Sequence, residues 1–139
     1  MQTLKRHVHT LIAKGAFTAA ITVAADLARR NPEMADCYGL IAEAEEAAGF
    51  TKAAIQSVSH AIALAPLQPG YRITRSRLYL KDRRLQDAID DINSIIALER
   101  AKNNISFIRD AIACRDELLE RLACSRPSSE TGLTSSRPS

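Results

Sequence analysis

The sequence contains no tryptophan, few aromatic residues (4%) and only three cysteines among 139 residues. Close packing of small aliphatic side chains must therefore supply much of any hydrophobic core. The cysteines lack the spacing of metal ligands and are odd in number, which favours free thiols in a cytoplasmic protein; they are Cys37, Cys114 and Cys124. No apolar run is long enough to span a membrane, and the basic segment before Ile12 is a poor signal peptide.

Groups suited to catalysis are also scarce. His7 and His9 lie two places apart, so on a helix they face different directions and cannot share a ligand. His60 falls in a predicted helix and is interpreted as a packing or surface residue. No glycine-rich phosphate-binding loop is present. The sequence therefore predicts neither an enzyme, nor a metal site, nor a bound cofactor.

The sequence does contain a repeat of 34 residues, the period of helix–turn–helix solenoids. The dipeptide alanine–isoleucine recurs at this interval, beginning at Ala20, Ala54 and Ala88. Gly15 and Gly49 lie five places before two of these alanines, where a turn between helices is needed. Pro32 and Pro66 lie twelve places after them, where a helix should stop. We therefore expect an all-α solenoid of antiparallel helix pairs, with no further domain in front of it and with repeats at 1–34, 35–68 and 69–102.

Residues 103–124 are predicted to form one capping helix instead of a fourth repeat. Glu117 stands where a turn would be needed, and the predicted apolar stripe consists of Ile105, Ile108, Ile112, Leu119 and Leu122. A helix with one apolar face can cover the end of a repeat array, although the same helix could instead pair with another subunit. Residues 125–139 contain one large apolar residue, Leu133, and are predicted to be a disordered tail.

Over residues 1–102 the chain resembles the tetratricopeptide-repeat proteins. The resemblance is best in the second helix of the middle repeat, between Ala54 and Pro66, and Tyr38 fits the aromatic place near the start of a first helix. The third repeat departs most from the family, since its Leu-Gly pair, its glycine and its proline are replaced by Arg75-Ser76, Arg83 and Arg100.

The resemblance implies that the first helix of each repeat lines a concave groove. Carried over to this sequence, the groove residues are Lys5, His9, Ile12, Gly39, Glu43, Glu46, Ile73, Arg77 and Lys81. The three repeats carry net charges of +3 (five basic, two acidic), −3 (one and four) and +3 (eight and five), so we expect basic ends and an acidic middle. A mixed-charge, partly apolar protein segment would be complementary to such a groove. An ordinary solvated face would carry the same charges.

These observations favour a cytoplasmic adaptor or small chaperone that binds a protein or peptide segment. A small chaperone of bacterial secretion is compatible with this size and repeat number. Family members that hold the C-terminal carboxylate of heat-shock chaperones use five polar residues, and only Lys5 matches here; the other places read His9, Leu40, Gly70 and Thr74. That co-chaperone role is not expected.

Two alternatives differ in class from a peptide-binding adaptor. The chain could be a self-associating scaffold subunit that uses the terminal helix or the first repeat as its interface. It could also bind nucleic acid through the basic third repeat, whose cations are Arg72, Arg75, Arg77, Lys81, Arg83 and Arg84. The pattern argues against nucleic acid, because few aromatic side chains accompany these cations.

Overall fold

The computed structural model describes residues 2–125, and this part of the chain is helical without any strand. Its elements are α1 (Gln2–Ala13), α2 (Phe17–Arg30), α3 (Ala35–Ala47), α4 (Thr51–Leu64), α5 (Pro69–Lys81), α6 (Leu85–Ala101) and α7 (Ile105–Ser125). The predicted tail lies outside the described residues except for Ser125, at which α7 ends. None of the described helices combines the length and the hydropathy that a membrane span requires.

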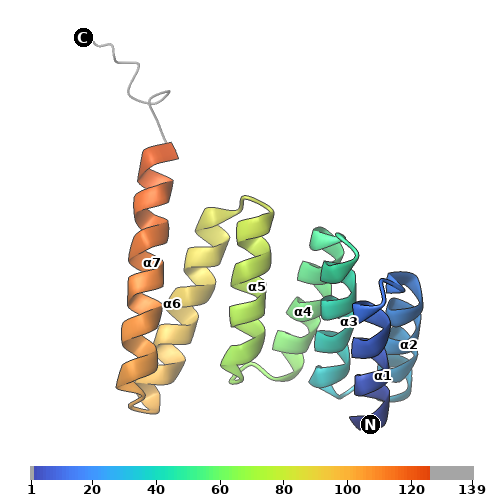
Figure 1. The fold of residues 1–139 in the computed structure, drawn as a ribbon. Coiled ribbons are helices and arrows are strands. Elements are labelled where there is room, and N and C mark those ends of the chain that lie inside the picture. The colour runs from blue at the N-terminus through green and yellow to red at the C-terminus, as the bar shows by residue number, and fades with distance from the viewer. Residues whose placement is uncertain (1, 126–139) are drawn as a thin grey trace.

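The helices stand side by side in chain order and run alternately up and down, from α1 and α2 at one end to α7 at the other (Figure 1). Each helix packs against the next one along the chain, and α1 also contacts α3. This is the predicted solenoid of antiparallel helix pairs, in which each pair buries its apolar faces against its neighbours.

The turn inside each helix pair contains one residue in the left-handed backbone conformation. Gly15 and Gly49 have φ angles of 80° and 89°, as predicted for these positions. Arg83 takes the same place in the third pair with a φ of 61°. This conformation is unfavourable for a residue with a side chain, because its Cβ lies close to the following carbonyl oxygen. The turns share one hydrogen bond, from the amide after the left-handed residue to a carbonyl five residues earlier, as in Arg84 N to Tyr79 O at 2.8 Å. The third turn therefore forms without its glycine.

The second helices end differently with and without proline. Pro32 and Pro66 come two residues after the ends of α2 and α4, which are both 14 residues long. No proline follows α6, where Arg100 stands at the equivalent place, and this helix runs for 17 residues to Ala101. Because a proline would have blocked the added turn, its absence lengthens α6 and shifts the start of α7.

The three alanines at the repeat interval are buried completely. Ala20, Ala54 and Ala88 each have 0% exposure, as expected of small residues at a helix crossing. The core around them is aliphatic, and its largest fully buried side chains include Leu40, Leu78 and Val58. Small side chains at the crossing let these larger ones interdigitate, as the scarcity of aromatic residues requires.

One departure from the repeat pattern has a clear structural reason. Arg75, which replaces the leucine of the expected Leu-Gly pair, donates hydrogen bonds from α5 to Asp91 of α6 at 2.6 and 2.8 Å and to Ser59 of α4 at 3.0 Å. The Asp91 side chain is only 5% exposed. Hydrogen bonding to Asp91 raises the pKa of Arg75 above its ordinary value in spite of burial. Arg75 thus joins three helices, through an ion pair to α6 and a hydrogen bond to α4, where an apolar contact was expected.

The apolar stripe predicted for the terminal helix is displaced. Leu118 is the buried residue of α7, with 3% exposure, whereas Ile105 and Leu119 are 67% and 43% exposed. A helix turns about 100° per residue, so the side facing α6 follows Ala111 and Leu118, which are seven residues apart. The line through Ile105 and Leu119 lies beside this contact instead of within it. The prediction was therefore wrong for these two residues.

Candidate functional site

Six of the nine predicted groove residues surround one hollow. Side chains of α1, α3 and α5 enclose about 530 Å³, and the lining comprises His9, Ile12, Glu43, Glu46, Ala47, Arg77 and Lys81. We call this space the charged hollow. The repeat period explains the convergence, because equivalent positions of successive first helices point in the same direction.

The charges in this hollow pair with one another across the helices. His9 Nε2 lies 2.9 Å from Glu43 Oε2, which joins α1 to α3. Arg77 and Lys81 of α5 each place a nitrogen 2.7 Å from a carboxylate oxygen of Glu46 on α3. The acidic middle predicted from the sequence is therefore largely neutralised by the basic ends.

Glu46 is the centre of this charge network. Burial alone would raise its pKa, but hydrogen bonds from Arg77 and Lys81 outweigh burial and hold the pKa below its ordinary value. Hydrogen bonding to Glu46 likewise raises the pKa of Arg77. The Glu46 side chain is 15% exposed, whereas those of Arg77 and Lys81 are 51% and 52% exposed. A ligand in the hollow would therefore meet the cations and not the carboxylate between them.

Lys5 and Gly39 lie apart from the charged hollow, in a region closed by a residue that sequence reasoning missed. The Tyr71 ring of α5 packs on Gly39, where an added Cβ would lie 2.9 Å from Tyr71 Cε1. The Tyr71 hydroxyl donates a hydrogen bond to Asp36, whose other oxygen lies 3.9 Å from Lys5 Nζ. Burial and the Asp36 carboxylate raise the pKa of Tyr71 above its ordinary value. The absence of a side chain at Gly39 therefore lets the Tyr71 ring pack closely against α3.

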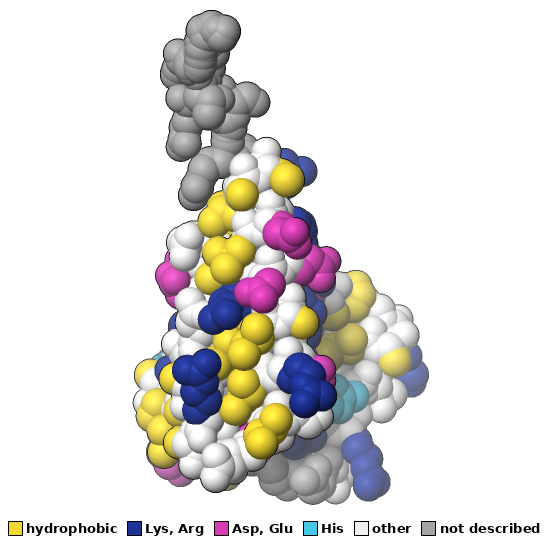
Figure 2. Space-filling model, turned by 90° about the vertical axis from the view of Figure 1, so that its left-hand side faces the viewer, with side chains coloured by type: hydrophobic (Ala, Val, Ile, Leu, Met, Phe, Trp, Pro, Cys, Tyr) yellow, Lys and Arg dark blue, Asp and Glu magenta, His cyan; other side chains and the backbone are white. Residues whose placement is uncertain are grey.

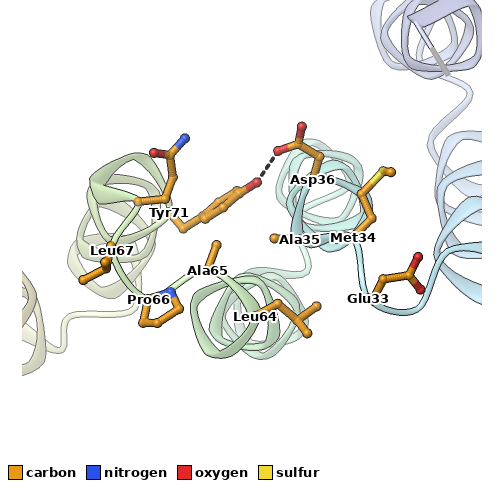
Figure 3. A pocket seen from close by; sticks show the side chains of 10 residues that line it. Glu33, Met34, Ala35, Asp36, Leu64, Ala65, Pro66, Leu67 and Tyr71 are labelled. Atoms are coloured by element: carbon orange, nitrogen blue, oxygen red, sulfur yellow. Dashed lines mark hydrogen bonds between the residues drawn. The ribbon is translucent and has the colours of Figure 1, made fainter.

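Tyr71 also borders a second hollow, at the loops between repeats. Figure 3 shows its ring reaching from α5 toward Asp36 at the start of α3, with the apolar side chains of Met34 and Leu64 on the other side. The space measures about 670 Å³ and is open to solvent along Leu67, which is 71% exposed. We call it the loop-edge hollow. It contains none of the nine predicted groove residues.

Ile73 belongs to a third hollow, which the sequence did not reveal. It measures about 230 Å³ between α5, α6 and α7, and its lining comprises Ile73, Ser76, Ile92, Ile95, Phe107, Asp110, Ala111 and Cys114. We call it the apolar hollow. Its α7 residues were expected to cap the array instead of lining a cavity. Asp110 supplies the acidic side chain among these mostly apolar neighbours.

The charged and apolar hollows are both lined by residues of α5. Ile73 lines the apolar hollow and Arg77 lines the charged hollow. Residues four apart lie on the same face of a helix, so a segment that passes over α5 can enter both hollows. The resulting surface offers cations at one end and apolar side chains, together with Asp110, at the other.

Three of the basic residues of the third repeat are engaged within the protein. Arg75 is held by Asp91, Arg84 Nε lies 2.7 Å from Asp87, and Arg72 donates a hydrogen bond to the backbone oxygen of Pro66. Because these cations are engaged within the protein, they are poorly placed to neutralise the phosphates of a nucleic acid.

Other candidate residues are accounted for by packing. His60 stacks on Tyr38 with ring centroids 4.0 Å apart. Leu40, at one place of the carboxylate-binding pattern, is 2% exposed and lies in the core. Within residues 2–125 no three His, Cys, Asp or Glu side chains come together in a way that could hold a metal ion.

No family model matches the chain, and no curated protein matches it. Solved structures do resemble it. PcrH in complex with the chaperone-binding region of PopD has a TM-score of 0.72 and 17% identity, over 86% of this chain and 91% of PcrH. The Yersinia enterocolitica type III secretion chaperone SycD, in complex with a peptide of the translocator YopD, has a TM-score of 0.72 and 15% identity, over 91% and 94% of the two chains.

A third similar structure is the first TPR domain of Spaghetti (RPAP3) bound to the HSP90 peptide SRMEEVD. It has a TM-score of 0.71 and 19% identity, over 88% of this chain and 94% of that one. At these identities the likeness shows the fold alone. This chain therefore has the tetratricopeptide-repeat fold, as its 34-residue period predicted.

Proposed function

We propose that this protein is a non-catalytic adaptor or chaperone that holds a segment of a partner protein in the groove formed by α1, α3, α5 and α7. The observation that carries the proposal is that Ile73 of the apolar hollow and Arg77 of the charged hollow lie four residues apart on one face of α5. One segment can use both, with an acidic residue near Arg77 and Lys81 and an apolar residue near Ile73.

The similar structures support this proposal by analogy. PcrH was solved with a region of PopD, SycD with a peptide of YopD and the TPR domain of Spaghetti with a peptide of HSP90. We infer that the groove of this chain also receives a protein segment, and that residues 1–124 act as one binding unit because α7 completes the apolar hollow. We place this activity in the cytoplasm, in keeping with three free cysteines.

A displayed library of random peptides, selected on the full chain, tests the proposal. We expect selected peptides to pair an acidic residue with an apolar one and to bind more weakly to Ile73→Asp and to Arg77→Glu. Leu67→Asp changes an exposed apolar residue at the loop-edge hollow, and Arg29→Glu changes a cation that is 75% exposed in its side chain; both are matched controls. Selected peptides that bind all four variants equally would contradict the groove assignment.

A further inference from the structure

The last helix carries a line of apolar side chains that is largely uncovered. Ile105, Ile112 and Leu119 recur every seven residues and therefore lie along one side of α7. Ile105 is 67% exposed and Leu119 is 43% exposed, while Ile112 is half-buried and also packs against the core that α6 forms with Leu118. Figure 2 shows hydrophobic side chains running along this end of the molecule. We call these three residues the α7 line.

The position of α7 in the solenoid explains why this line is open. The preceding first helices α3 and α5 each pack between two second helices, namely that of the previous pair and that of their own pair. α7 follows α6 as a first helix would, but within residues 2–125 no second helix comes after it. One of its two helix-binding sides is therefore without a helix, and a helix is the shape that fits it.

The charges beside the α7 line indicate which kind of helix would be complementary to it. Arg109 follows Ile105 by four residues and Asp116 follows Ile112 by four, so both flank the line on the same side, and both are exposed. In Figure 2 basic side chains lie beside the lower half of this face and acidic ones beside the upper half. Such a surface is complementary to itself when it is turned upside down.

We propose that two copies of this chain associate through α7 in antiparallel orientation, with Ile112 near the two-fold axis. In this register Ile105 of one copy covers Leu119 of the other, and Arg109 comes beside Asp116 of the other. A parallel pair would instead place the Arg109 and Asp116 of one copy on the opposite side of the interface from those of the other, so that neither charge would gain a partner. In the single chain a carboxylate oxygen of Asp116 lies 3.5 Å from Arg115 Nε, and the Asp116 side chain is 60% exposed.

This association leaves the groove open. Phe107 and Cys114 line the apolar hollow, and they lie about 160° around the helix from Ile105 and Ile112. Peptide binding and self-association therefore use opposite sides of α7. The dimer goes beyond the proposed adaptor function, and each can fail without the other.

Sedimentation velocity of the full chain over a concentration series tests the proposal. We expect a monomer–dimer equilibrium whose dissociation constant rises more than about tenfold in Ile105→Ser and in Leu119→Ser, because each change acts twice in the dimer. Leu67→Ser removes a leucine at the loop-edge hollow that is 71% exposed, close to the 67% of Ile105, and should leave the equilibrium unchanged. A strictly monomeric wild type, or a dimer that ignores both α7 variants, would overturn the proposal.

Charge exchange tests the orientation. Arg109→Asp alone and Asp116→Arg alone should each weaken the dimer, and the two changes together should restore it. Disulfide formation provides a second measurement in a Cys114→Ser/Cys124→Ser background. Mixed Ile105→Cys and Leu119→Cys chains should cross-link to each other, whereas either chain alone should not. Efficient cross-linking of Ile105→Cys with itself, or no rescue by the double charge exchange, rules out the antiparallel pair.

Discussion

The first two helix pairs turn at glycines, stop at prolines and meet through small side chains. The region from α5 to α7 has Arg83 at its turn and an ion pair between its helices, and no proline follows α6. Both regions reach the same helical arrangement and the same complete burial of the repeat alanine. The comparison indicates that burial of the repeat alanine is compatible with either set of turn and stop residues, and that the missing proline goes with a longer second helix. α6 has 17 residues where α2 and α4 have 14, and the apolar hollow lies between α5, α6 and α7.

The largest expected effect concerns the ion pair of the C-terminal region. Asp91→Ala should lower the free energy of unfolding by about 3 kcal/mol, because it leaves the Arg75 guanidinium half-buried without its partner. Urea denaturation of the purified variant measures this change. Asp87→Ala, which removes an exposed partner of Arg84, is the control and should have a much smaller effect.

The double variant Arg75→Met/Asp91→Leu sharpens the same prediction. It should recover most of the lost stability, since apolar residues of similar size can replace a buried ion pair. Equal destabilisation by Asp91→Ala and Asp87→Ala would mean that the pair does not brace the third repeat.

The next effect concerns the crossing of the middle helix pair. Ala54→Leu should destabilise the protein by about 1–3 kcal/mol through overpacking, because Ala54 has no exposed surface. Ala47→Leu adds the same atoms at an exposed position of α3 and is the matched control. Thermal unfolding followed by circular dichroism compares the two; similar midpoints would contradict the assigned helix crossing.

The turn residues should respond in opposite directions in the two regions. Arg83→Gly should stabilise the protein by up to about 1 kcal/mol, since it relieves a left-handed backbone conformation that a side chain disfavours. Gly49→Ala should destabilise it by about the same amount, and no atom near Gly49 would clash with the added methyl group. Chemical denaturation of both variants decides the matter. A destabilised Arg83→Gly variant would show that the arginine side chain supports this turn by contacts of its own.

The smallest effect is the pH dependence of the charged hollow. The pKa of Glu46 is lowered in the folded protein, so its contribution to stability is present above its ordinary value of 4.5 and is lost as pH falls through the lowered pKa. Glu46→Gln should therefore lose less stability than wild type between pH 6 and pH 3, as measured by urea denaturation at each pH. Glu120→Gln changes an exposed carboxylate of α7 and should leave the wild-type pH profile unchanged.

The repeat period predicted most of the fold because a strict sequence interval fixes which faces of the helices meet. The family resemblance implied that His9, Glu43 and Arg77 line one groove, and the structure brings them to one hollow because they occupy one place in three successive repeats. What the sequence could not reveal depends on side-chain partners. The charged residues that were predicted to form separate basic and acidic regions pair with one another instead. Neighbouring first helices bring opposite charges within hydrogen-bonding distance.

The terminal helix was the least predictable part. The spacing of its apolar residues predicts an apolar stripe, but spacing does not say which of several apolar lines faces α6. In the structure Leu118 is buried, Ile105 is exposed and Phe107 lines the apolar hollow.

The central claim is that a partner segment lies across α5 and enters both hollows. Titration of the isotope-labelled protein with a selected peptide, followed by amide chemical shifts, tests it most directly. We expect the largest shifts at Ile12, Arg77, Ile73 and Phe107, with little change at Phe50 or Leu67. Shifts confined to the loop-edge hollow or to the α7 line would contradict the groove as the binding site.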